Sequence, residues 1–148
     1  MPDPPFDPLG RQVNATGRAM RGLLDAVLAD AGTTFSSWLV LLSLDARGPV
    51  IQKELARDLE VIGASIAERI DQLVAAGHVA RSPVPEDRRA SLVSLTPAGQ
   101  AVFDELLATM RATEAALTEG LSAEDIATTR RVLAQVAERA RTLRAARP

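Results

Sequence analysis

The stretch DRRASLVSLTPAG, residues 87–99, decides the fold. It begins as a charged turn carrying two arginines, continues as a short apolar strand and ends at Thr96-Pro97. Threonine is a good helix N-cap and proline suits the first helical position, so a helix is predicted to begin at Pro97. Upstream, the segment SPVP, residues 82–85, closes another short strand predicted over about residues 78–81. The two strands predict a β-hairpin with a cationic tip.

Two short helical segments precede this hairpin. Residues 51–59 predict a helix whose inward positions are Ile51, Leu55 and Leu59. After a turn at residues 60–61, a second helix is predicted from about Gly63 to Ala76, with an inward stripe of Ile66, Ile70, Leu73 and Val74. Helix, turn, helix and hairpin is the order of a winged helix, a fold that reads DNA with its second helix and its hairpin.

Helices with large apolar faces flank this unit. Upstream they are predicted over residues 9–31 and 36–46, the second apolar nearly all round and therefore the buried central helix. Downstream they are predicted over residues 97–119 and from the Ser122 cap to about residue 145. The first helix and the last two carry more apolar surface than a small winged helix covers. A second copy of the chain is the economical partner, and a helical bundle within one chain is the alternative.

The predicted fold class is therefore mainly α with a small β-hairpin wing. Residues 1–9 are rich in proline and aspartate and are expected to form a flexible N-terminal arm. Residues 10–47 are the N-terminal helices, 48–96 the winged helix-turn-helix and 97–148 the C-terminal dimerisation helices.

Composition excludes several functions. The 148-residue chain has no cysteine, which removes disulfides, thiolate zinc sites and cysteine nucleophiles. It has one histidine, and we find no phosphate-binding glycine loop or metal-ligand constellation, so we expect no enzyme, no cofactor and no metal. Because the sequence shows neither a secretion signal nor a long apolar run, we expect a cytoplasmic protein.

Net charge gives the DNA interpretation no support. The chain has a formal charge of −2, and residues 48–96 hold seven carboxylates against six cations. Any attraction for nucleic acid must therefore come from the local placement of cations on one face.

The pattern Asp-x-Arg, five residues, Leu-Thr, two residues, Gly within residues 87–99 resembles the wing signature of the MarR (multiple antibiotic resistance regulator) family of transcription factors. The resemblance extends through LARDL at residues 55–59 and IDQLVAAG at residues 70–77, and more weakly over nearly the whole chain. It implies a homodimer paired through its terminal helices, with two recognition helices in successive major grooves of a pseudo-palindromic DNA site. It also implies repression that a ligand releases.

The resemblance assigns roles to the wing. Arg89 would enter the minor groove, Asp87 would orient its guanidinium through a charge-assisted bond, and Arg88 would contact the DNA backbone. The alternative for Asp87 and Arg89 is that they only pin the hairpin.

Further DNA contacts are expected around the two helices. Ser65 aligns with a family position that often contacts DNA, and Arg69 and Gln72 point outward from the same predicted helix. Lys53 and Arg81 flank the site as candidate phosphate contacts, with plain solvated surface as the alternative.

The chain also departs from the family pattern. Ile51 and Ile62 replace capping Ser or Thr residues, Gly63 and Ala64 replace larger residues, and Glu68 stands where arginine is common. A carboxylate there repels phosphates but can accept from a cytosine amino group. These departures keep a second function open: a divergent winged helix that has lost DNA binding and acts as a protein- or small-molecule-binding module.

The resemblance finally implies a cleft for a small aromatic or anionic effector. The candidate lining residues are Trp38, Phe35 and Met20, with Arg18 and His78 as polar partners. The alternatives are that Trp38 belongs to the core and that His78 is an ordinary, partly exposed histidine.

Overall fold

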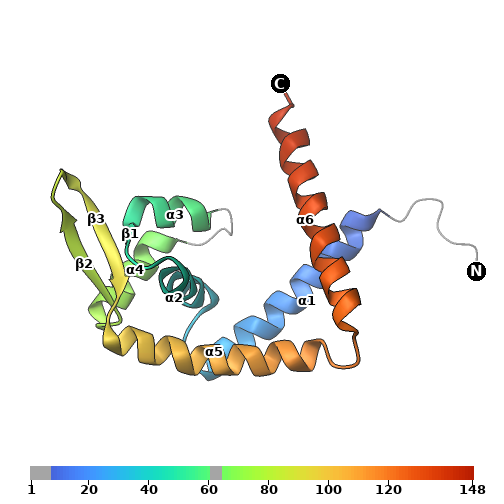
Figure 1. Cartoon of the computed structure of the whole chain (residues 1–148), viewed down its shortest axis with the longest axis horizontal. Helices are drawn as coiled ribbons and strands as arrows, with labels where there is room; N and C mark the ends of the chain where they lie inside the picture. Colours follow the sequence, from blue (N-terminus) through green and yellow to red (C-terminus); the bar gives the residue numbers. More distant parts are fainter. Residues whose placement is uncertain (1–7, 61–64) are drawn as a thin grey trace, which may run out of the picture. The chain divides into compact units, whose positions relative to one another are not determined.

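The computed structural model describes residues 8–60 and 65–148. The elements in chain order are α1 (Leu9–Asp30), α2 (Phe35–Arg47), β1 (Val50–Ile51), α3 (Gln52–Glu60), α4 (Ile66–Ala75), β2 (Val79–Val84), β3 (Asp87–Leu95), α5 (Pro97–Leu117) and α6 (Ala123–Ala145) (Figure 1). They form two compact units, one up to Thr109 and one from Met110 onward, so the boundary falls within α5. The predicted fold class, mainly α with a hairpin wing, is confirmed.

The three strands form one antiparallel sheet in the order β1-β3-β2. Val50 of β1 pairs with Val93 of β3, and Val79 of β2 pairs with Leu95. The hairpin of β2 and β3, here called the wing, is longer than predicted. Its strands run to Val84 and from Asp87, so both arginines lie in β3 rather than in the turn.

Two local predictions about strands were wrong. Pro83 does not close β2, because β2 is an edge strand and a proline without an N–H group is tolerated there beside the irregularity at Pro83/Val84. Ile51 is not the first inward residue of α3. It belongs to β1, where it pairs with Leu92, and α3 begins at the next residue.

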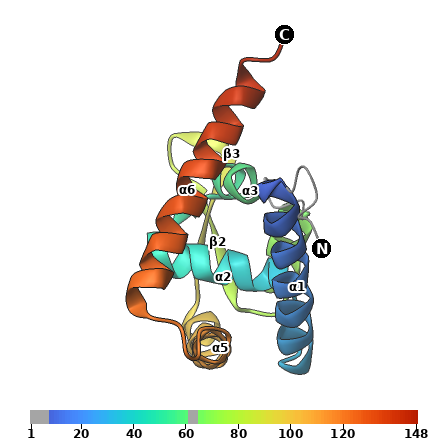
Figure 2. The ribbon, with the colours of Figure 1, turned by 90° about the vertical axis from the view of Figure 1, so that its right-hand side faces the viewer.

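Helix α2 forms the centre of the first unit, as predicted. Trp38, Val40, Leu41 and Leu44 are buried, although Leu42 remains 36% exposed. The side chain of Thr34 caps the helix by accepting a hydrogen bond from the Ser37 amide at 3.2 Å. Helices α1 and α2 are bent by 86° at the break between them (Figure 2). No single helix in the described ranges has the length and hydropathy of a membrane span; α1 and α2 reach them only as this bent pair.

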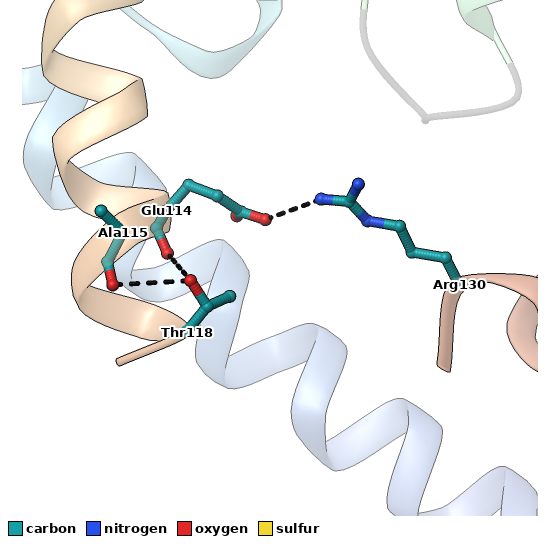
Figure 3. A network of polar contacts seen from close by, with 4 residues as sticks. All are labelled: Glu114, Ala115, Thr118 and Arg130. Carbon is teal, nitrogen blue, oxygen red and sulfur yellow. Dashed lines mark hydrogen bonds and ion pairs between the residues drawn. The ribbon is translucent and has the colours of Figure 1, made fainter. Parts of the chain in front are cut away.

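The second unit contains the end of α5 and α6. Glu114 and Arg130 form an ion pair across the turn at 3.2 Å, and the Thr118 hydroxyl donates to the Glu114 carbonyl at 2.8 Å (Figure 3). Ser122 caps α6, as predicted, by accepting from the Asp125 amide at 3.0 Å. No residue of α6 is buried.

A compact junction joins the end of α4, the sheet and the start of α5. The Thr96 hydroxyl donates to the Gly77 carbonyl at 2.6 Å and accepts from the Gly99 amide at 3.0 Å. The Thr96 amide donates to the His78 carbonyl at 3.1 Å. The predicted helix start at Thr96-Pro97 is therefore confirmed, and Thr96 also holds the preceding turn in place.

Gly99 has no room for a side chain. A Cβ there would lie 1.9 Å from the His78 carbonyl oxygen, which is backbone and cannot turn aside. We therefore expect Gly99→Ala to lower the free energy of unfolding by about 1–3 kcal/mol, measured by urea denaturation at fixed protein concentration. Gly22→Ala in α1 is the matched control, because nothing lies within 4 Å of its Cβ. That change should raise stability by up to about 1 kcal/mol. Equal effects of the two changes would contradict this account of the junction.

Candidate nucleic-acid interface

An open groove of about 1000 Å³ lies between α3, α4 and the wing. It brings together four of the residues predicted from sequence, Lys53, Arg81, Asp87 and Arg89. It also contains Arg57, which the sequence analysis missed. Lys53 and Arg57 are four residues apart on α3, and this helical spacing was the available signal.

The wing presents two unpaired arginines. Arg88 and Arg89 are exposed, and neither guanidinium has a hydrogen-bond or ion-pair partner within the described residues. The Asp87 carboxylate accepts a hydrogen bond from the Arg89 backbone amide at 2.9 Å and makes none with its guanidinium. The predicted orienting bond to the side chain is thus absent from this structure, and the contact is instead a local bond at the start of β3.

Arg81 joins three elements rather than facing solvent alone. From β2, its Nε donates to the Gln52 Oε1 of α3 at 2.8 Å, and its Nη2 pairs with the Asp71 carboxylate of α4. The guanidinium predicted to meet a phosphate is therefore occupied within the protein. No local pattern revealed these partners, because Gln52 and Asp71 lie 29 and 10 residues away in sequence.

The buried and exposed faces of α4 match the predicted helical stripe. Ile66, Ile70 and Leu73 are buried, and Val74 is half-buried. Ser65, at the N-cap, is exposed and makes no side-chain capping bond. Val61, Ile62, Gly63 and Ala64 lie outside the described residues, so the predictions about the turn and the first residues of this helix stay predictions.

The outward side chains of α4 bond to one another. The Arg69 guanidinium donates to the Gln72 Oε1 at 2.6 Å, and the Gln72 Nε2 donates to the Glu68 carboxylate at 3.4 Å. Glu68 and Gln72 are exposed and Arg69 is half-buried. Both predicted contacts, Arg69 and Gln72, are thus already engaged with each other.

A second cavity, of about 550 Å³, lies between the α1–α2 loop, α2, α4 and residues 102–109 of α5. Its polar lining includes Thr33, Ser37, Arg69, His78 and Glu105. The α4 residues that line it also carry the outward face described above.

Among the predicted effector residues, His78 alone lines this cavity. Trp38 is 6% exposed and stacks on Phe103 with ring centroids 5.5 Å apart, so it belongs to the core. Phe35 is covered by the Arg21 guanidinium at 4.1 Å. Met20 and Arg18 are exposed side chains of α1 outside the cavity lining.

Comparison with known proteins gives consistent matches. The family model described as MarR family matches residues 34–91. The multiple antibiotic resistance protein MarR of Escherichia coli K12 is 30% identical over 130 residues, which cover 87% of this chain and 90% of that protein.

Solved structures extend the similarity to three dimensions. A mutant E. coli MarR complexed with operator DNA has a TM-score of 0.76 and 30% identity, covering 87% of this chain and 93% of that one. The PcaV transcriptional regulator of Streptomyces coelicolor, in complex with its natural ligand, has a TM-score of 0.76 at 23% identity and shares the fold. The match covers 89% of this chain and 93% of that one.

The contact of Arg81 with Asp71 predicts a measurable coupling. Their side chains are 34% and 64% exposed, so we expect a double-mutant cycle of Arg81→Gln and Asp71→Asn to give a coupling free energy of up to about 1 kcal/mol in urea unfolding. Arg88→Gln with Asp71→Asn is the control pair and should be additive, because Arg88 has no partner in the described residues. Additive behaviour of the first pair would contradict the bridge.

Proposed function

The chain belongs to the MarR family of transcriptional regulators, and we propose that it acts as a homodimer that reads a pseudo-palindromic operator with α4 and the wing. The observation that carries this proposal is the groove between α3, α4 and the wing, whose lining holds four cations, Lys53, Arg57, Arg81 and Arg89, against three carboxylates, Glu54, Asp71 and Asp87. Arg81 and Asp71 pair with each other, so Lys53, Arg57 and Arg89 against Glu54 and Asp87 leave a small local excess of positive charge. Phosphates respond to the nearest cations more than to distant ones. We place its action in the cytoplasm, where its bacterial relatives meet their DNA.

Each cation has a task in this proposal. Arg89 enters the minor groove, because its exposed guanidinium at the wing has no competing partner in the described residues. Arg88, Lys53 and Arg57 contact phosphates, and Ser65 donates to a phosphate or base edge. Arg81 is reassigned: its side chain holds the wing against both helices, and it positions the groove without contacting DNA.

Exposed apolar side chains support the dimer. On α1 they include Leu9, Met20 and Leu23, and from the end of α5 through α6 they include Leu117, Leu121, Val132, Leu133 and Leu143. Burying these faces against a second copy removes them from water, and the two-fold symmetry of such a dimer matches a pseudo-palindromic site. A dimer seated on a promoter excludes other proteins, so we propose repression as its direct effect.

The cavity beside α4 is the proposed effector site. Its volume lies in the range of small-molecule sites, and the Arg69 guanidinium and His78 suit an anionic ligand. A ligand there would contact α4 directly, which supports release from DNA as the response.

The test is a fluorescence-anisotropy titration against duplexes from the upstream intergenic region of its own gene. Arg89→Ala should lower affinity by about 1–3 kcal/mol per contact. Lys53→Gln should reduce the slope of log K against log salt by about 1.8 per dimer, because each phosphate contact contributes about 0.9.

Arg81→Gln separates positioning from phosphate contact. It should weaken binding, but the slope of log K against log salt should equal that of the wild type, since no phosphate contact is lost. Absence of specific binding by the wild type at low and moderate salt would contradict the proposed function and favour a module that no longer binds DNA.

The effector site predicts a thermal shift with a small aromatic carboxylate such as benzoate. At a hundredfold excess over Kd the ligand should stabilise the protein by about 2.7 kcal/mol and raise Tm. Ala76→Leu should abolish the thermal shift, because the larger side chain fills the cavity. Ala75 is the exposed neighbouring residue and does not line the cavity, so Ala75→Leu should keep the shift. An equal shift in both variants would place the ligand elsewhere.

A further inference from the structure

The outward face of α4 carries a carboxylate without an ion-pair partner. Within α4, which is described throughout, the charged residues are Glu68, Arg69 and Asp71. Asp71 is paired with Arg81, and the Arg69 guanidinium is bonded to Gln72. Glu68 is exposed, and its one contact in the described residues is the long 3.4 Å bond from Gln72. The helix that faces DNA in the proposed function therefore offers a negative charge.

A chain of bonds along α4 links that carboxylate to its neighbours, although the last bond is long. Arg69 occupies the Gln72 Oε1, which fixes the amide plane and turns the Nε2 group toward Glu68. Gln72, with both ends of its amide engaged, is not available for bidentate reading of a base. Its effect is to position the neighbouring side chain, four residues away on the same helical face.

A carboxylate can bind only a donor. In the major groove, the donors are the N4 amino group of cytosine and the N6 amino group of adenine, whereas guanine shows two acceptors and thymine one acceptor and a methyl group. Adenine N6 adjoins the N7 acceptor, which repels an anion. Cytosine N4 adjoins a C–H edge instead, so cytosine is the base that a carboxylate binds best.

We propose that Glu68 is a specificity-determining residue that accepts a hydrogen bond from the amino group of one cytosine in each half-site. This inference rests on the proposed function, because it requires α4 to enter the major groove. The carboxylate also repels phosphates, so it weakens binding to every other sequence. The affinity for DNA then comes from the cations of α3 and the wing, and the discrimination between base sequences comes from α4.

The experiment measures competition between duplexes in which each base pair of the half-site is replaced in turn. The wild type should prefer cytosine at one position per half-site by about tenfold or more. Glu68→Ala should lose that preference while binding other sequences more tightly. Glu68→Gln should move the preference toward adenine, because an amide can bond N6 and N7 together.

Glu86→Gln is the matched control. It removes the same charge from the exposed turn of the wing, so it should strengthen binding to all duplexes equally and keep the cytosine preference. If Glu68→Ala changes binding to every duplex by one factor, Glu68 is only repulsive and the inference is overturned. A wild type that binds a specific site without any such cytosine overturns it too, while leaving the proposed function in place. A wild type that binds no site overturns both.

Discussion

The contact on which the rest depends is the junction at Thr96. Its hydroxyl donates to the Gly77 carbonyl, which follows α4, and accepts from the Gly99 amide in the first turn of α5, while its own backbone amide donates to the His78 carbonyl. Gly99 lets the helix backbone approach that carbonyl closely. The recognition helix α4, the wing and α5 are therefore bonded together at Thr96, which restricts their movement relative to one another. Residues of α4 and α5 also line the same cavity, so a ligand bound there would contact both helices.

The second constraint is Arg81, which fixes the wing against the two helices of the motif. A two-stranded hairpin is a weak structure by itself, and its arginines can enter a groove only if its direction is fixed. By bonding Gln52 and Asp71, Arg81 sets that direction from both α3 and α4. The cations of the groove then form one surface. Binding DNA therefore costs less conformational entropy than it would with a wing that moves freely.

Local signals predicted most of the fold. The Thr96-Pro97 start, the Ser122 cap and the stripe of α4 all depend on neighbours a few residues apart, so the sequence contains them directly. The end of β2 was missed because tolerance of Pro83 depends on the order of strands in the sheet. The partners of Arg81 and the cavity lining were missed for the same reason, since they come from elements distant in sequence.

In the proposed complex, α4 and the wing of each protomer bind DNA as a single unit within a symmetric dimer. Hydroxyl-radical footprinting on the operator tests it most directly, because the radical reports contact with each sugar. We expect two footprints related by the two-fold axis of the dimer, each with minor-groove protection by the wing beside the major groove that holds α4. A single asymmetric footprint, or one without minor-groove protection, would contradict it.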